Sequence, residues 1–251
     1  MSTAAATRRI CLWSGPRNVS TALMYSFAQR PDTVVVDEPL YAHYLAVSGA
    51  RHPGRAEVLA SQDKDGNAVM RALAEEPVAR PVLFAKQMAH HLVDIDLAWL
   101  EHFDNVLLIR DPAEMLPSLA AVLPEVSLRD TGLESQARLV ERLEAAGGRP
   151  FCIDARLLLL DPPGVLRAVC ERLGLSFFPS MLSWPLGPRP EDGVWAKYWY
   201  ASVHRSSGFR PWRPSNRDMP PGLERLHEAC RPFYAFLLKR AVGAQGADRA
   251  D

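Results

Sequence analysis

Five short apolar segments, separated by stretches with helical patterning, constrain the fold of this chain most. They span residues 10–13, 33–36, 81–86, 105–110 and 150–155. Each segment is apolar at consecutive positions, which is typical of a strand buried on both faces of a parallel sheet. Parallel neighbours need long crossovers, and the helical stretches supply them. The pattern predicts an α/β fold, a three-layer sandwich with a central parallel sheet.

The same pattern sets the expected domain organisation. With 251 residues, 48% of them hydrophobic, the chain can bury one full core. We expect a flexible N-terminus over 1–8, a single domain over 9–240 and a flexible tail over 241–251. Segment 42–80 contains Gly, Pro, charge and two helical pieces, and is predicted to be an insertion over one face. Segment 183–220 is rich in aromatic residues and is predicted to be an ordered lid loop.

Charge and cysteine content exclude several classes of function. The 29 basic and 29 acidic residues balance, so bulk attraction to nucleic acid or to an acidic membrane is not expected. The four cysteines form no CxxC pair or Cys/His cluster, which argues against a zinc site or a disulfide framework. No apolar run approaches the roughly 18 residues of a membrane span. We therefore expect a cytoplasmic protein without a metal; the composition leaves the oligomeric state open.

Polar residues follow four of the predicted strands. They lie in segments 14–21, 37–41, 86–91 and 110–118. The carboxyl ends of parallel strands meet at one edge of the sheet, where helix N-termini present free N–H groups and where ligands bind in α/β proteins. The sequence therefore predicts a binding site at this edge.

The first of these segments, "SGPRNVST", has the composition of an anion-binding loop. It lacks the Gly-Lys pair of a nucleotide-hydrolysing P-loop. We expect Gly15 and Pro16 to shape the turn and Arg17 to offer its guanidinium to an anion. The following hydroxyls are expected to cap the helix and to bond phosphate oxygens. The predicted anion-binding residues are Gly15, Pro16, Arg17, Asn18, Val19, Ser20 and Thr21. A well-capped helix with a surface arginine is the alternative interpretation.

The fourth segment places Arg110 at a strand end and Ser118 eight residues later. Together with the first segment, it resembles the sulfotransferases that use 3′-phosphoadenosine 5′-phosphosulfate. In that family a Pro-Lys/Arg-Ser-Gly-Thr-Thr loop binds the 5′-phosphosulfate. An Arg-Asp-Pro segment, with a serine eight residues after the arginine, binds the 3′-phosphate.

The match is made residue by residue. The first motif is matched by Pro16, Arg17, Ser20 and Thr21, with Asn18-Val19 in place of Ser-Gly. The second is matched without a change of spacing by Arg110, Asp111, Pro112 and Ser118. The resemblance covers residues 9–123 well and the remainder loosely. It implies a P-loop-like sulfotransferase architecture, the phosphosulfate nucleotide as co-substrate without a metal, and a small-molecule acceptor. A β-branched residue at Val19 restricts the backbone, so we expect fewer N–H contacts to phosphate there.

Glu38 and His90 are the candidates for the general base that deprotonates the acceptor. Several branches of the family keep a glutamate in the region of Glu38, although a capping role for this residue or for Asp37 is equally consistent with the sequence. Cytosolic relatives instead have a histidine in a Lys-Thr-His segment after the third strand. Here that position is Met88, so the match to His90 fails, and an ordinary surface or packed histidine is the alternative.

Lys86 matches the lysine of the same family segment. The resemblance implies that it contacts the bridging oxygen of the donor and stabilises the leaving phosphate. The alternative is a lysine whose chain packs at a strand end while its ammonium reaches water.

A C-terminal segment, "HRSSGF", resembles the glycine-containing basic loop with which relatives cover the 3′-phosphate and adenine. It lacks the usual Arg-Lys-Gly order. The residues that would make these contacts are Arg205, Ser206, Ser207 and Gly208.

Three other functions remain open at this level. A small-metabolite kinase would share the fold but should show Gly-Lys-Ser/Thr. A pyridoxal phosphate enzyme could use Lys86 as its Schiff base. A nucleotide-binding module could bind the bisphosphate and transfer nothing. The sequence does not identify the acceptor, which could be an alcohol, a phenol, a sugar or a lipid headgroup.

Overall fold

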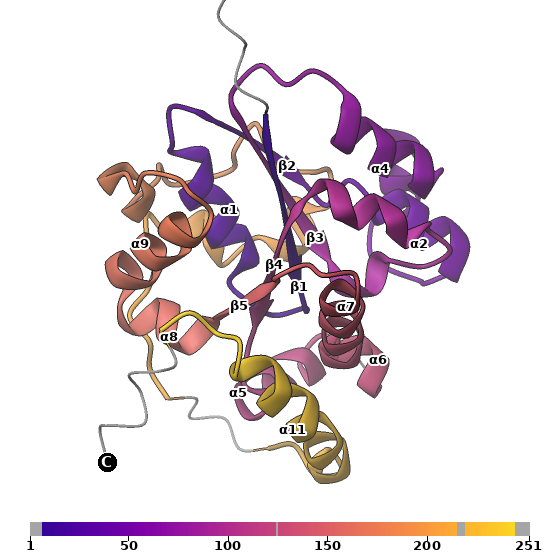
Figure 1. Ribbon diagram of the computed structural model, residues 1–251. Helices are drawn as coiled ribbons and strands as arrows, with labels where there is room; N and C mark the ends of the chain where they lie inside the picture. Colours follow the sequence, from indigo (N-terminus) through magenta and orange to yellow (C-terminus); the bar gives the residue numbers. More distant parts are fainter. Residues whose placement is uncertain (1–6, 124, 215–218, 244–251) are drawn as a thin grey trace, which may run out of the picture.

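The computed structural model describes residues 7–123, 125–214 and 219–243. Its centre is a five-stranded sheet in which every pairing is parallel, with the order β2-β3-β1-β4-β5 (Figure 1). The strands are β1 (Arg8–Ser14), β2 (Thr33–Asp37), β3 (Val82–Met88), β4 (Asp104–Ile109) and β5 (Phe151–Asp154). Each predicted apolar segment forms one of them, so the predicted parallel sheet is confirmed.

Helices cover both faces of this sheet (Figure 1). Those along the first half of the chain are α1 (Ser20–Ala28), α2 (Tyr41–Ser48), α3 (Arg55–Ser61), α4 (Gly66–Glu75) and α5 (Pro112–Ala120). Those along the second half are α6 (Leu128–Thr131), α7 (Leu133–Ala145), α8 (Ala155–Leu160), α9 (Pro162–Arg172), α10 (Ala196–Trp199) and α11 (Glu224–Leu238). Four 3-10 turns complete the described elements: Ala89–His91, Leu97–His102, Pro179–Leu182 and Val203–Arg205.

Side chains alternate along β1 between two apolar cores. Ile10 and Leu12 point to the core that contains residues of α1, α8 and α9. Cys11 and Trp13 point to the core built with α4, α5, α7 and α11. From Ile10 to Ser14 the strand is buried because both of its faces are covered, which explains the unbroken apolar sequence of residues 10–13. The three-layer architecture follows.

The predicted insertion, 42–80, lies between β2 and β3. The structure has three helices there, α2, α3 and α4, where the sequence indicated two. Buried residues of α2 and α3 pack with Trp195, Ala196 and Tyr200 in a third apolar cluster. Helices α2 and α3 thus pack against α10 and against the residues on either side of it.

The predicted lid, 183–220, is described as far as residue 214 and again from 219; its residues 215–218 lie outside the described part. Ser183 and Gly208 pair across an isolated antiparallel bridge. Lys197 of α10 forms an ion pair of 2.6 Å with Glu57 of α3. The segment is therefore attached to the domain by backbone and side-chain contacts.

The predicted flexible ends fall largely outside the described residues, which exclude 1–6 and 244–251. Arg8 is nevertheless the first residue of β1. At the other end, Ala241 forms a parallel bridge with Cys152 of β5, and the N–H of Val242 donates to the carbonyl of Cys152. Arg8, Ala241 and Val242 thus make backbone contacts with the sheet, although the sequence placed them in the flexible ends.

The crossovers that leave β1 and β4 run in opposite directions along the sheet. After β1 the chain moves to β2 on one side, whereas after β4 it moves to β5 on the other. The carboxyl ends of β1 and β4 therefore flank a crevice where the two crossovers diverge, which is the usual ligand position in open α/β sheets. The loops at 15–19 and 110–111 meet at this place.

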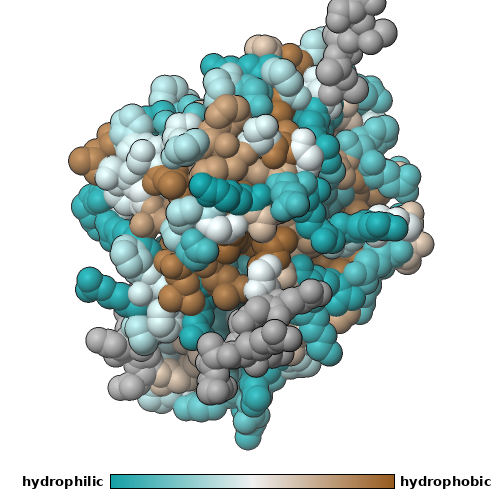
Figure 2. All heavy atoms as spheres, turned by 60° about the vertical axis from the view of Figure 1, so that its left-hand side comes forward, coloured by the Kyte–Doolittle hydropathy of each residue, from teal (hydrophilic) through white to brown (hydrophobic). Residues whose placement is uncertain are grey.

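The molecular surface mixes polar and apolar residues. The side of the molecule that carries α1, α8 and α9 comes forward in Figure 2, where hydrophilic residues surround hydrophobic ones gathered near the centre. Within the described ranges, none of the helices combines the length and apolar character needed to cross a bilayer.

Candidate functional site

The loop after β1 is held by its own backbone geometry and by Asn18. Arg17 has a φ of 53°, in the left-handed region that costs energy for a residue with a Cβ. The Asn18 amide nitrogen donates to the carbonyl of Leu108 on β4 at 3.0 Å, and its oxygen accepts from the Val19 N–H at 2.9 Å. Val19 itself has a φ of −88°. Val19, which stands where the family motif has glycine, therefore has an unstrained backbone, because the left-handed residue of the loop is Arg17.

Gly15 is required by close packing, since its φ is not positive. A Cβ at this position would lie 2.6 Å from the carbonyl oxygen of Thr131, a backbone atom at the end of α6. The Cα of Gly15 in turn approaches Gly132 at the start of α7. The junction between α6 and α7 thus supports the underside of the loop.

We expect Gly15→Ala to lower the free energy of unfolding by about 1–3 kcal/mol, because either the loop or the α6–α7 junction must move. Chemical denaturation measures this loss. Gly147→Ala is the control: its Cβ would meet open space, so only the positive φ of 82° contributes. Equal stability of Gly15→Ala and the wild type would contradict the packing argument.

The predicted capping role of Ser20 and Thr21 is not observed. Helix α1 begins at Ser20, its N-cap residue is Val19, and no side chain caps it. Ser20 and Thr21 are the first two residues of the helix, after the N-cap position, so their hydroxyls do not occupy the position of a capping side chain. The first turn of α1 is consequently left without a side-chain acceptor, which suits an external anion at its positive end.

The two motifs are brought together by direct hydrogen bonds. Arg17 Nε donates to Ser118 Oγ at 3.0 Å, across 101 residues of sequence. Arg110 Nη1 donates to the carbonyl of Arg17 at 2.8 Å. Residues predicted for the 5′ and the 3′ ends of the nucleotide are therefore in direct contact at the carboxyl ends of β1 and β4.

Further contacts orient Arg110. Its Nε donates to Glu114 Oε2 at 3.3 Å, and the other Glu114 oxygen accepts from Trp212 Nε1 at 2.7 Å. Asp111 caps α5 through the N–H of Ala113 at 2.8 Å. Trp212 belongs to the predicted lid, and the sequence did not indicate its contact with the second motif.

A cavity of about 140 Å³ opens beside the loop after β1. One wall contains five of the seven predicted anion-binding residues, all except Asn18 and Val19, and another contains Glu38, Lys86 and His90. Its lining residues are Gly15, Pro16, Arg17, Ser20, Thr21, Glu38, Tyr41, Tyr44, His52, Lys86, Met88, His90, His91, Leu119, Val122, Leu123, Asp130, Trp199 and Tyr200. Four of these rings, those of Tyr41, Tyr44, His52 and Tyr200, were not singled out by the sequence. The apolar and aromatic wall suits the carbon skeleton of a small molecule.

Glu38 is buried and directly follows the last residue of β2. Its φ of 39° makes it a second left-handed residue at this edge of the sheet. Its backbone N–H donates to the carbonyl of Lys86 at 2.8 Å, and its own carbonyl accepts from Gln62 Nε2 at 3.0 Å. Its side chain caps no helix, since α2 has the N-cap Leu40 without a side-chain bond. Burial raises the pKa of Glu38, and the neighbouring Lys86 ammonium partly opposes this. The capping alternative for Glu38 is therefore not observed.

Lys86 is buried inside β3 and its ammonium does not reach water. Its Nζ donates to Asp37 Oδ1 at 2.9 Å, to Glu38 Oε1 at 2.6 Å and to the hydroxyl of Tyr200 at 2.6 Å. Burial alone would lower the pKa of Lys86, but the two carboxylates hold it well above its ordinary value. An ammonium has three N–H groups, and all three are used. This arrangement leaves none for the bridging oxygen that the resemblance assigned to Lys86. Asp37 binds Lys86 and Tyr200 and does not cap α2.

His90 and His91 follow β3 on a 3-10 turn, and both line the cavity. Burial lowers the pKa of His90 to about 4, so its ring is neutral near pH 7. His91 stacks on Tyr44, with ring centroids 4.6 Å apart and planes inclined by 21°, and burial holds its pKa well below the ordinary value. Both Nδ1 atoms are buried without a hydrogen-bond partner among the described residues.

The residues of the predicted basic loop do not line this cavity. Ser206 Oγ donates to the carbonyl of Val203, and the Ser207 carbonyl accepts from the Trp184 N–H. Gly208 lies against the carbonyl of Leu182, where a Cβ would approach to 2.9 Å. Arg205 is exposed, and its carbonyl accepts from Arg210. Ser207 and Gly208 thus connect the two sides of the predicted lid, residues 183–220, which is called the covering segment below. The contact of the four loop residues with the nucleotide remains a prediction.

The family model described as "Sulfotransferase domain" matches residues 8–241. The chain belongs to the sulfotransferase family. The resemblance inferred from the two loops is thereby confirmed, and the match also covers the segments beyond residue 123 that resemble the family only loosely.

Two solved sulfotransferase structures have a fold similar to that of this chain. The sulfotransferase domain of the Synechococcus PCC 7002 olefin synthase is 17% identical, covers 94% of this chain and 97% of its own, and has a TM-score of 0.60. A sulfotransferase from Alicyclobacillus acidocaldarius is also 17% identical, with coverages of 93% and 96% and a TM-score of 0.53. The sulfotransferase α/β architecture is thus confirmed.

Two Arabidopsis thaliana proteins are similar in sequence. They are named branched-chain-amino-acid aminotransferase-like proteins 2 and 1, and are 37% and 39% identical over 226 residues, or 90% of this chain. The chain spans 40% of the length of these relatives.

Proposed function

We propose that this protein transfers a sulfuryl group from 3′-phosphoadenosine 5′-phosphosulfate to a hydroxyl or amine of a small acceptor. One observation carries the proposal: the anion-binding loop at Arg17 and the buried carboxylate of Glu38 line the same cavity. A donor phosphosulfate bound at the loop would therefore lie near a base that can receive the acceptor's proton.

The donor would be held at the crevice between β1 and β4. The uncapped first turn of α1 and the side chain of Arg17 suit the 5′-phosphosulfate, since both offer N–H donors to an anion. Arg110 and Ser118 suit the 3′-phosphate, and their bonds to Arg17 keep the two subsites in register. Within the described residues, no cluster of His, Cys, Asp or Glu suited to a metal ion occurs.

In the transfer, the acceptor oxygen forms a bond to sulfur while the bond from sulfur to the bridging phosphate oxygen breaks. The acceptor proton passes to Glu38, and the electron pair of the broken bond remains on the phosphate of the adenosine bisphosphate. Arg17 would stabilise the negative charge that develops on the leaving phosphate. The raised pKa of Glu38 brings a carboxylate closer to the acceptor hydroxyl in proton affinity, which favours general-base catalysis.

The state of Lys86 argues against a pyridoxal phosphate enzyme. A Schiff base requires a neutral amine, whereas the two carboxylates keep Lys86 protonated and hydrogen-bonded. The aminotransferase-like names of the Arabidopsis proteins belong to chains of which this one spans 40%. A kinase is disfavoured by the absence of a Gly-Lys pair in the loop.

We expect adenosine 3′,5′-bisphosphate to bind about tenfold to a hundredfold more tightly than 5′-AMP, because the additional phosphate gains charge-assisted hydrogen bonds. Calorimetric titration measures both affinities without knowledge of the acceptor. Ser118→Ala should reduce this preference, whereas Ser61→Ala on α3, outside the cavity, should not.

Equal affinity for the two nucleotides would contradict the donor assignment. Tight bisphosphate binding without sulfuryl transfer to any of a panel of alcohols, phenols and amines would instead support a nucleotide-binding module.

A further inference from the structure

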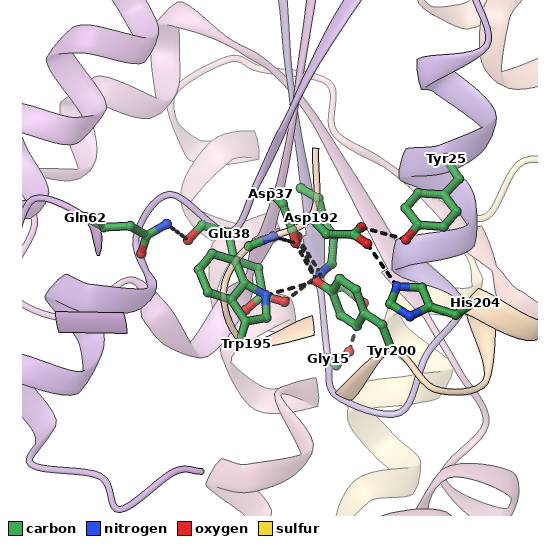
Figure 3. Close-up of polar contacts among 12 residues, drawn as sticks. Gly15, Tyr25, Asp37, Glu38, Gln62, Asp192, Trp195, Tyr200 and His204 are labelled. Atoms are coloured by element: carbon green, nitrogen blue, oxygen red, sulfur yellow. Dashed lines mark hydrogen bonds and ion pairs between the residues drawn. The ribbon is translucent and has the colours of Figure 1, made fainter. Parts of the chain in front are cut away.

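A tyrosine from the covering segment completes the polar cluster around Glu38. Tyr200, the residue that follows α10, is buried, and its hydroxyl lies 2.8 and 2.7 Å from the two carboxylate oxygens of Asp37. The same hydroxyl lies 2.6 Å from Lys86 Nζ, and Trp195 Nε1 donates to it at 3.1 Å. Figure 3 shows Tyr200 pointing toward Asp37 and Trp195 pointing toward the Tyr200 hydroxyl, with Glu38 beside them.

The hydrogen atoms of this cluster can be assigned by counting donors. A phenol has one O–H, and the Tyr200 hydroxyl lies within hydrogen-bond distance of both Asp37 oxygens, so Tyr200 donates to Asp37. Its oxygen then accepts from Lys86 and from Trp195. Tyr200 and Lys86 therefore both donate to Asp37, and Lys86 also donates to Glu38.

Two carboxylates, Asp37 on β2 and Asp192 in the covering segment, attach that segment to the sheet and to α1. The N–H of Gly193 donates to Asp37 Oδ2 at 3.2 Å. Next to it, Asp192 accepts from the hydroxyl of Tyr25 on α1 at 2.6 Å and bonds His204 Nε2 at 2.9 Å. Figure 3 shows Tyr25 and His204 both pointing toward the carboxylate of Asp192, one from above and one from below. The segment therefore reaches the sheet through specific polar contacts.

The cluster contains more negative than positive formal charge. Asp37 and Glu38 compete for the single ammonium of Lys86. By donating to Asp37, Tyr200 disperses the charge of that carboxylate and weakens its attraction for the ammonium. In agreement with this, Lys86 lies nearer to Glu38, at 2.6 Å, than to Asp37, at 2.9 Å.

We propose that Tyr200, anchored by Asp37, is a positioning residue that holds the Lys86 ammonium against Glu38 and thereby keeps the base ionised. Lys86 then serves the base directly, rather than the leaving phosphate. The inference rests on the proposed function only in naming Glu38 as the base. The ionisation of Glu38 can be measured whether or not transfer occurs.

The groups that face Glu38 set the sign of the expected effects. Lys86 on β3 favours the carboxylate form, whereas Asp37, the last residue of β2, disfavours it. Tyr200 also favours the carboxylate form. From α2, Tyr41 also faces this cluster; burial raises its pKa and the Glu38 charge adds to the rise, so Tyr41 stays neutral. Weakening the contact between Lys86 and Glu38 must therefore raise the pKa of Glu38.

The test is a titration of the Glu38 carboxyl carbon by NMR, using protein labelled with ¹³C at glutamate side chains and no donor or acceptor. Glu38→Gln assigns the signal by removing it. Tyr200→Phe should raise the midpoint by about half to one pH unit, the size expected for one hydrogen bond. Lys86→Met should raise it by about one to three units, as expected for loss of an adjacent opposite charge.

Tyr198→Phe is the matched control. It removes a tyrosine hydroxyl of the same segment that bonds exposed Glu57, so it should leave the midpoint unchanged. If Tyr200→Phe does not fold, Trp195→Phe keeps Tyr200 and removes only the indole donor, and it should shift the midpoint upward by a smaller amount. An unchanged Glu38 midpoint in folded Tyr200→Phe, or in Trp195→Phe when Tyr200→Phe does not fold, would overturn the proposal. Failure of the bisphosphate titration would instead contradict the proposed donor and leave the midpoint measurement valid.

Discussion

Replacing Glu38 by glutamine is expected to reduce turnover by about 10²–10⁴-fold while leaving donor affinity unchanged. Glutamine keeps the size of the side chain but cannot accept the acceptor's proton. Donor affinity should be preserved because the nucleotide subsites lie on β1, α1 and the segment after β4. Bisphosphate titration together with single-turnover transfer measures the two quantities separately.

The pH dependence of the wild type gives an independent measure. Burial raises the pKa of Glu38, so kcat/KM should fall as the pH decreases through a value above the ordinary range for glutamate. This fall should disappear in Glu38→Gln. A rate controlled by His90 would instead decline near its pKa of about 4.

His90→Ala provides the comparison for Glu38→Gln. The His90 ring lines the cavity, so its loss alters packing, but turnover should fall far less than in Glu38→Gln. The reverse pair of results, with His90 essential and Glu38 dispensable, would make the histidine the base. A large decrease in the melting temperature of Glu38→Gln would assign Glu38 a structural role.

The sheet and the two loops could be predicted because their signals are local. Strands buried on both faces must be apolar at consecutive positions, and each loop follows its strand directly. The parallel arrangement then implies that Arg17 and Arg110 meet at one edge, and the structure adds that Arg110 bonds the carbonyl of Arg17. The Arg-to-Ser spacing is also local, because Ser118 lies on the helix that Arg110 precedes.

The environment of Lys86 could not be predicted, because its partners are distant in sequence. Tyr200 is 114 residues from Lys86 and 163 from Asp37, and it belongs to a segment with little regular structure. The aromatic content of that segment indicated ordered packing, but no periodicity identifies which ring reaches the sheet. Similarly, the need for glycine at position 15 arises from Thr131, a contact between segments that the sequence does not relate.

We expect Arg17→Ala to reduce kcat/KM about 10²–10³-fold, the loss typical when one donor to developing transition-state charge is removed. The side chain lies in the cavity wall and its Nε bonds Ser118, so both the 5′ subsite and its link to the second motif are affected. Folding should be retained, because Asn18 and the packing of Gly15 still hold the loop. Thermal denaturation and steady-state kinetics measure the two properties, and Arg138→Ala, at an exposed position on α7, is the charge-matched control.

The left-handed backbone at position 17 allows the role of the guanidinium to be separated from that of the loop conformation. Glycine adopts a φ of 53° without strain, whereas alanine does not. If the guanidinium is what matters, Arg17→Gly and Arg17→Ala should lose kcat/KM to a similar extent while differing in stability, with the glycine variant the less strained in the folded state. If the loop conformation is what matters, Arg17→Gly should retain bisphosphate affinity close to that of the wild type, and that result would reduce Arg17 to a structural residue of the turn.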